Sequence, residues 1–146
     1  MYYERALLAD RLNRSHDAER DLRRFLRMKP NDAQGMNALG YTLANRGQRL
    51  AEARRLIEAA LQQQPTNPMI LDSMGWVLFR QGKLKDALSY LEQAYEQMKD
   101  AEIAAHLGEV LWRLGQRDAA RQIWEEAKQR DPEHKVLQDT LRRLKP

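Results

Sequence analysis

The sequence contains no cysteine, few prolines and glycines, and no long apolar run. The lack of cysteine excludes disulfide bonds, thiolate metal sites and cysteine nucleophiles. No stretch approaches the ~18 consecutive apolar residues of a membrane-spanning helix, and the opening MYYERALLADRLNR does not follow the order of a secretory signal peptide. The chain also lacks a glycine-rich phosphate loop and a serine nucleophile motif. These absences predict no catalytic residue, no cofactor, no metal, and no direct membrane contact from this segment.

Charge is abundant but evenly spread. There are 25 lysines and arginines against 21 aspartates and glutamates, a net charge of +4, and the two signs are interleaved almost everywhere. Nucleic-acid binders more typically gather their basic residues on one face. The spread of charge therefore favours no nucleic-acid partner, while 42% hydrophobic and 32% charged residues indicate a folded chain.

Small residues recur along the chain with a period of about 34 residues, the length of a helical repeat unit. The recurring positions form three series: Gly40, Gly75 and Gly108; Gly47, Gly82 and Gly115; Ala18, Ala53, Ala87 and Ala120. Between them lie amphipathic stretches that end before glycine or proline, which are helix stop signals. The pattern predicts helices over 1–13, 16–28, 33–46, 50–63, 68–81, 84–98, 101–114, 117–130 and 134–145, and no strand.

One glycine in each of the last three repeats is expected in the middle of a helix. Glycine there costs ~1 kcal/mol relative to alanine. A cost repeated at a fixed phase indicates that Gly40, Gly75 and Gly108 allow a close helix–helix approach. The alanine series lies at the matching place on the second helices, so the two helices of each unit are expected to pack tightly.

These features resemble the tetratricopeptide repeat, whose period is 34 residues and whose unit is two helices. The third unit carries the pattern most fully, with Leu71, Met74, Gly75, Leu78, Gly82, Leu84, Ala87, Leu91 and Ala94. The resemblance implies an all-α fold: a right-handed superhelical solenoid of four helix pairs plus a C-terminal capping helix. The expected repeats are about 1–32, 33–67, 68–100 and 101–133, with the cap helix at 134–145, in a single domain.

The beginning of the chain departs from a typical first repeat. By phase, Met1 falls at the third position of its unit, and YYERALLA is apolar where a terminal repeat usually carries a polar cap. We therefore expect the chain to be the C-terminal part of a longer array.

Stacked helix pairs form a superhelix whose concave side is lined by the first helix of each pair. In the family that the chain resembles, the second, fifth, ninth, twelfth and thirteenth residues of a repeat point into this groove. Helical periodicity agrees, because positions 72, 76, 79 and 80 share one face and 71, 74, 75 and 78 the other. The predicted partner-binding residues are Asn37, Tyr41, Asn45, Asp72, Trp76, Phe79, Arg80, Glu109, Trp112 and Arg113.

Aromatic and arginine side chains are those that commonly carry binding energy at interfaces. The groove is therefore expected to bind a protein or peptide, as a non-enzymatic scaffold or adaptor, with Trp76 in direct contact with the partner. Phe79 and Trp112 are compatible with either the groove or the packing between repeats, while Trp124 is expected in the core. The lysine and asparagine clamp by which some family members grip a C-terminal carboxylate is absent.

The histidines suggest no catalytic or metal centre. His106 shares a helix face with Glu102 and Glu109, but ligands from a single helix rarely complete a metal site. We therefore expect His106 at the rim of the groove, solvated or facing a partner.

Phrases such as NALGYTLANRG and EIAAHLGEVLWRLGQRDAARQIWEEA are similar to the C-terminal repeats of proteobacterial tetratricopeptide lipoproteins. Some of these act as adaptors for a periplasmic carboxyl-terminal processing protease. This resemblance implies a location at the periplasmic face of the outer membrane; without it, the cytoplasm is expected.

Two alternatives remain open. The first is self-association through the N-terminal end or the convex face, which the apolar residues Tyr2, Tyr3, Leu7 and Leu8 suggest. Related helical repeats bind RNA, although the scattered charge and the groove acids Asp72 and Glu109 argue against it.

Overall fold

The computed structural model describes residues 15–146, and all regular structure in this part is helical. The helices are α2 (Ser15–Met28), α3 (Ala33–Arg46), α4 (Leu50–Gln63), α5 (Pro68–Arg80), α6 (Leu84–Gln97), α7 (Ala101–Arg113), α8 (Arg117–Arg130) and α9 (Lys135–Leu144). Each end lies within one residue of its sequence prediction. None of these helices has both the length and the apolarity needed to cross a membrane. The expected helix over 1–13 and the residues proposed for self-association lie outside the described part.

The first helix of each complete pair begins at a side-chain cap. Asp32 accepts a hydrogen bond from the backbone N–H of Gly35, Asn67 from Met69, and Asp100 from Glu102 and Ile103. These caps satisfy N–H groups that have no partner inside the helix. The second helices α4, α6 and α8 have no side-chain cap hydrogen bond, and each follows its partner through a tight turn. Gly47, Gly82 and Gly115 adopt positive φ in those turns, a conformation that favours glycine.

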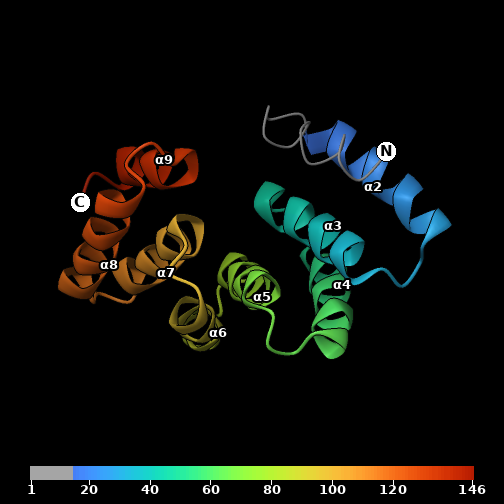
Figure 1. The fold of residues 1–146 in the computed structure, drawn as a ribbon, viewed down its shortest axis with the longest axis horizontal. Helices are drawn as coiled ribbons and strands as arrows, with labels where there is room; N and C mark the ends of the chain where they lie inside the picture. Colours follow the sequence, from blue (N-terminus) through green and yellow to red (C-terminus); the bar gives the residue numbers. More distant parts are fainter. Residues whose placement is uncertain (1–14) are drawn as a thin grey trace.

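The helices are arranged as an arc (Figure 1). Helices α3, α5 and α7 lie along its inner side, and α4, α6 and α8 along its outer side. Helix α9 packs against α7 and α8 and closes the C-terminal end. The described part of the chain is thus an all-α solenoid whose open side is lined by the first helix of each pair.

The mid-helix glycines are the points of closest approach between paired helices. A Cβ at Gly40 would lie 2.6 Å from Ile57 Cγ1, and one at Gly75 would lie 2.5 Å from Leu91 Cγ. A Cβ at Gly108 would overlap the indole of Trp124, which is buried in the core as predicted. The periodic glycines therefore permit the packing that sets the inner helices in place.

Candidate functional site

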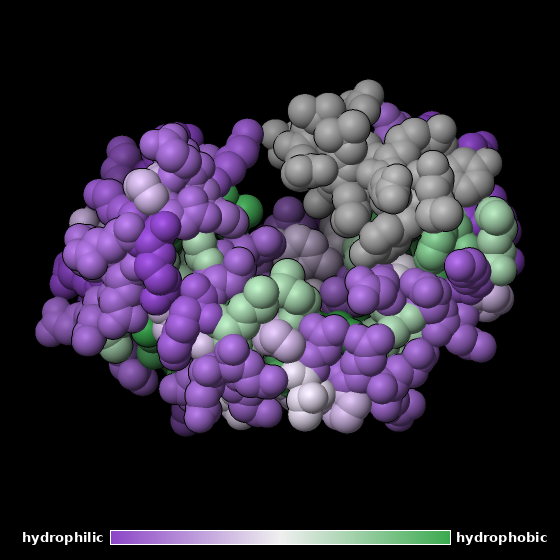
Figure 2. Space-filling model, viewed as in Figure 1, coloured by the Kyte–Doolittle hydropathy of each residue, from purple (hydrophilic) through white to green (hydrophobic). Residues whose placement is uncertain are grey.

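The predicted groove residues lie on the inner helices, but they differ in their access to solvent. Asn45, Arg80 and Arg113 are exposed; Asn37, Tyr41, Phe79 and Trp112 are half-buried; Asp72, Trp76 and Glu109 are buried. Figure 2, which views the arc from the side, shows hydrophilic side chains over the α7–α9 end. The groove therefore has an exposed rim and a floor that is largely covered.

The burial of three groove residues differs from the sequence expectation. Asp72 and Glu109 are each 2% exposed and Trp76 is 6% exposed. Each is covered because a residue of a neighbouring helix packs against it. Trp76, expected in direct contact with a partner, is thus largely covered, because the rings of Phe79 and His106 are stacked against its indole.

The rings around Trp76 explain how it is covered. Its indole is stacked on the imidazole of His106, with centroids 4.1 Å apart, and on Phe79, with centroids 4.9 Å apart. Its Nε1–H donates a hydrogen bond of 3.3 Å to Asn45 Oδ1. Phe79 is thus the half-buried member of the stack and presents the accessible aromatic surface.

His106 is buried, so its predicted place at the rim is wrong. Its Nδ1 lies 2.9 Å from Asp72 Oδ1, which places the ring between α5 and α7. Its Nε2 lies 3.3 Å from the hydroxyl oxygen of Tyr41, and that hydroxyl donates a 2.7 Å hydrogen bond to Glu102. These four side chains form one network that links α3, α5 and α7.

The directions of these hydrogen bonds suit a protonated imidazole. An imidazolium has two N–H donors, and it meets two acceptors here, the Asp72 carboxylate and the oxygen of Tyr41. Burial lowers the pKa of His106, but the nearby carboxylates of Asp72, Glu102 and Glu109 outweigh it, so the pKa lies above its ordinary value. Burial raises the pKa of Asp72, against the opposing effect of His106. The pair therefore retains a proton more strongly than its separated groups.

Asp72, Glu102 and His106 also have the composition of a metal-binding cluster. One ligand atom from each lies within 4.8 Å of the others. The sequence grouped His106 with Glu102 and Glu109 instead, and the structure turns Glu109 toward another partner. Each member of the cluster is engaged in the network with Tyr41 or with another member. Hydrogen bonding alone thus accounts for the proximity of these groups.

The cap helix completes the groove at its C-terminal end. Arg143 of α9 donates two hydrogen bonds to the buried carboxylate of Glu109, at 2.9 and 2.6 Å. Arg113, on the same helix as Glu109, approaches it only to 3.9 Å. Arg143 is not among the predicted groove residues, because α9 was expected only to cap the last repeat. Because α9 packs against α7, it continues the inner row of helices formed by α3, α5 and α7. The predicted helix that follows the last repeat was the signal in the sequence that could have pointed to Arg143.

A cavity of about 540 Å³ lies at this point. It is lined by Asn45, Trp76, Phe79, Arg80, Gly82, Leu84, Glu109, Arg113 and Arg143. Phe79 therefore belongs to the groove while also packing against the core. Of the ten predicted residues, six line this cavity, and Tyr41 and Asp72 join the network beneath it.

Trp112 faces away from the cavity. Its ring lies 5.7 Å from that of Trp124 of α8, and the guanidinium groups of Arg117 and Arg121 lie over it at 4.2 and 5.2 Å. Trp112 thus packs within its own repeat. Asn37 is half-buried on α3, and its Oδ1 has no hydrogen-bond partner among the described residues.

The sequence matches known families. Two profiles described as tetratricopeptide repeat match residues 3–68 and residues 78–144. A TPR repeat-containing protein of Pseudomonas aeruginosa is 49% identical over 109 residues, which cover 75% of this chain and 18% of the relative. The chain thus spans less than a fifth of the length of that relative.

Solved structures with the same fold include several repeat proteins. An O-GlcNAc transferase mutant of Thermobaculum terrenum has a TM-score of 0.74 at 21% identity, covering 90% of this chain and 26% of that one. A thermophilic TPR protein of Thermus thermophilus has a TM-score of 0.60 at 18% identity, covering 94% and 93%. A TPR protein with an unusual peptide-binding site has a TM-score of 0.61 at 23% identity, covering 99% and 76%. At these identities the likeness concerns the fold.

Proposed function

Because the chain belongs to the tetratricopeptide repeat family, we propose that it is a non-catalytic scaffold that binds a protein segment in its concave groove. The observation that carries this proposal is the cavity beside Phe79, which is lined by residues of α3, α5, α6, α7 and α9. The rim supplies exposed arginine and asparagine side chains, and Phe79 supplies an accessible aromatic surface.

The groove is formed before a partner arrives. Trp76 is stacked between Phe79 and His106, and Glu109 is fixed by two hydrogen bonds from Arg143. A site that is already ordered loses little conformational entropy on binding. This preorganisation supports a role in which the solenoid is rigid and the partner segment adapts to it.

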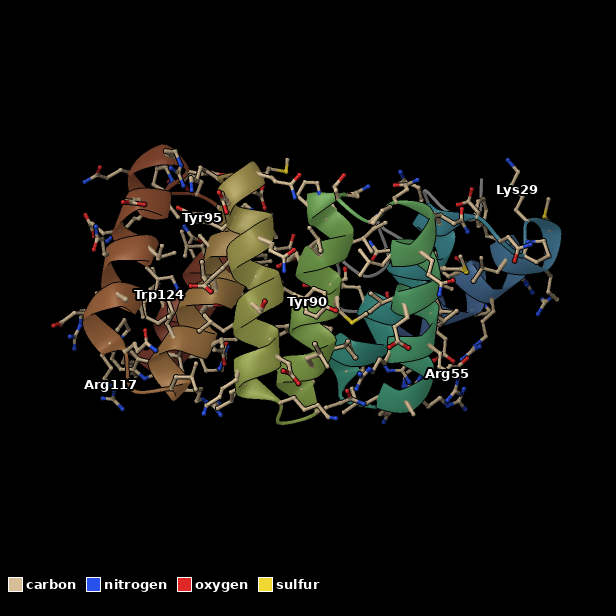
Figure 3. All side chains as sticks on the ribbon, turned by 90° about the horizontal axis from the view of Figure 1, so that it is seen from below. Lys29, Arg55, Tyr90, Tyr95, Arg117 and Trp124 are labelled. Carbon is tan, nitrogen blue, oxygen red and sulfur yellow. The ribbon has the colours of Figure 1, made fainter. Side chains whose placement is uncertain are left out.

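Site-specific photo-crosslinking in cells tests the proposal. A photoreactive amino acid at Asn45, in the groove rim, is expected to form a defined adduct with a partner. The matched control is the same amino acid at Arg55, which lies on the outer side of α4 (Figure 3) and is exposed. Loss of the Asn45 adduct on Phe79→Ala, with helicity unchanged, is the expected result. Equal adducts from both positions would contradict groove binding.

The finer form of the proposal is an adaptor role for a periplasmic carboxyl-terminal processing protease, with a location at the periplasmic face of the outer membrane. It is supported by the similarity of the repeats to those of proteobacterial tetratricopeptide lipoproteins. Such an adaptor binds both the protease and its substrate. The expected result is a ternary complex of the three purified proteins on gel filtration. If neither the protease nor its substrate binds, the adaptor role is overturned. The crosslinking experiment then still tests binding in the groove.

A further inference from the structure

The cavity beside Phe79 has more positive than negative groups. Its charged lining residues are three arginines, Arg80, Arg113 and Arg143, and one acid, Glu109. Arg143 forms two hydrogen bonds with Glu109 and so neutralises it. Two guanidinium groups, those of Arg80 and Arg113, remain without a strong anionic partner among the described residues.

The position of Arg80 is defined by the turn that follows α3. A Cβ at Gly47 would lie 2.6 Å from Nη2 of Arg80, so the guanidinium rests against the backbone of this glycine. Arg80 is exposed, and it makes no ion pair with the described residues. Its guanidinium therefore lies at the entrance of the cavity with its donors available.

Arg113 occupies the equivalent place one repeat later. Its guanidinium carbon lies 5.6 Å from the centroid of Phe79, and its side chain is 53% exposed. Its distance of 3.9 Å from Glu109 is too long for a hydrogen bond. The two arginines thus belong to consecutive repeats, with the ring of Phe79 next to them.

The hollow on the outer face has the opposite balance. It measures about 440 Å³ and its charged lining residues are Arg54, Glu58 and Asp86. Arg54 pairs with Glu58 at 3.3 Å. The excess of arginine over acidic side chains is therefore a property of the concave cavity and is not found in the outer hollow.

Resting on the proposed function, we infer that the segment bound in the groove is acidic. An apolar side chain of the segment contacts Phe79, and side-chain carboxylates of neighbouring aspartate or glutamate residues bind Arg80 and Arg113. The planar guanidinium matches a carboxylate with two parallel hydrogen bonds. Because the arginines come from two repeats, they suit two carboxylates along an extended internal segment. A chain terminus would supply only one terminal carboxylate.

Selection from a displayed library of random twelve-residue peptides tests this inference. The library is selected in parallel on the 146-residue wild-type chain, on the double variant Arg80→Gln/Arg113→Gln, and on Arg55→Gln as the matched control. We expect the wild type and the control to enrich peptides with acidic residues next to an apolar one. We expect the double variant to lose that enrichment. Equal helicity of the three proteins by circular dichroism establishes that the fold is intact.

Affinities of one selected peptide, synthesised with an amidated C-terminus, provide the quantitative measure. Each single arginine variant loses a charge-assisted hydrogen bond and is expected to weaken binding by at least about tenfold. Binding should also weaken with salt. Peptides that bind without acidic residues, or only with a free C-terminus, would overturn the inference while leaving groove binding intact. Selection of no peptide at all would count against both. Preferential binding of a single-stranded RNA of matched charge would show that the groove binds RNA and would overturn the inference of an acidic peptide.

Discussion

Two networks of charged side chains join neighbouring repeats, and they differ in their exposure to water. The first connects α2, α3 and α4: Glu19 pairs with Arg23 and Arg46 at 2.8 and 2.6 Å, and Arg23 pairs with Glu52 at 2.9 Å. The second connects α5, α7 and α9 through the pairs Asp72–His106 and Glu109–Arg143. Side chains of the first network are 14–31% exposed, whereas the acids of the second are only 3% exposed.

This difference decides what each network contributes. A partly solvated ion pair adds little stability, because water competes for both groups. A buried carboxylate has lost its water, so its remaining partner cannot be removed without leaving an uncompensated charge. The α2–α4 network therefore adjusts the stability of the repeat stack, while the α5–α9 network is a condition for the groove floor to exist.

The largest expected effect is that of His106→Ala. The substitution leaves Asp72 buried without its partner, and breaking a buried pair in this way costs about 3–5 kcal/mol. Glu19→Ala, the matched change in the other network, should cost much less. Denaturant unfolding measures both losses. Similar losses in the two variants would abolish the distinction between the networks.

Arg143→Gln should have the next largest effect. It removes the two charge-assisted hydrogen bonds to Glu109, a loss of about 1.5–3 kcal/mol. Because Arg143 belongs to α9, the backbone amides of the cap helix should exchange their hydrogens faster before those of α5 and α7 do. Arg142→Gln, on the same helix and exposed, is the control. An Arg143 variant as stable as this control would show that α9 is held by apolar contacts alone.

The two networks should respond to pH with opposite sign. Burial raises the pKa of Asp72 and the surrounding carboxylates raise that of His106. The native state then binds more protons than the unfolded state, so this contribution is complete below pH 6.5 for His106 and is lost as pH rises through its folded pKa. Above that pH, the imidazole loses the N–H that faces Tyr41 or Asp72. His106→Asn should flatten the alkaline decline of Tm, and an unchanged decline would contradict this assignment.

The α2–α4 network should act at the acid end. Burial opposes ionisation of Glu19, but hydrogen bonds from Arg23 and Arg46 lower its pKa below the ordinary 4.5; a hydrogen bond from Arg23 lowers the pKa of Glu52 in the same way. Their contribution is present above pH 4.5 and is lost as pH falls through the folded pKa values. The double variant Glu19→Gln/Glu52→Gln should therefore differ from wild type less at pH 3 than at pH 7. A constant difference would contradict this sign.

Salt should produce the smallest effect and sharpen the same comparison. Screening acts on exposed charges more than on buried ones. The cost of Glu19→Gln, expected at about 1 kcal/mol, should shrink between 0.05 and 0.5 M salt, while the cost of His106→Ala should stay the same. Equal salt dependence would place the two networks in the same environment.

The fold was predictable because its determinants are local and periodic. Gly40, Gly75 and Gly108 mark the close contacts of successive helix pairs, and glycine and proline mark the places where helices stop. The stop signals act within a few residues, and each glycine packs within its own helix pair, against a residue 16 or 17 positions later. The predicted helix ends consequently agree with the structure over the described residues.

The state of the groove residues was less predictable, because it depends on contacts between repeats. Trp76 lines the cavity, but its burial results from its contact with His106, which is not among the predicted groove residues. Glu109 is covered by Arg143, which lies beyond the last repeat. These contacts join residues that are 31 to 34 positions apart in the sequence. To predict them, one needs the distance between the neighbouring helices, which periodicity alone does not give.

The central claim is that a protein segment binds along α3, α5 and α7, and amide chemical-shift mapping tests it most directly. A selected peptide is titrated into the ¹⁵N-labelled 146-residue chain. The account predicts the largest shifts at Asn45, Phe79, Arg80 and Arg113 and at the indole N–H of Trp76, with little change at Arg55. Shifts centred on the outer helices α4, α6 and α8 would contradict it.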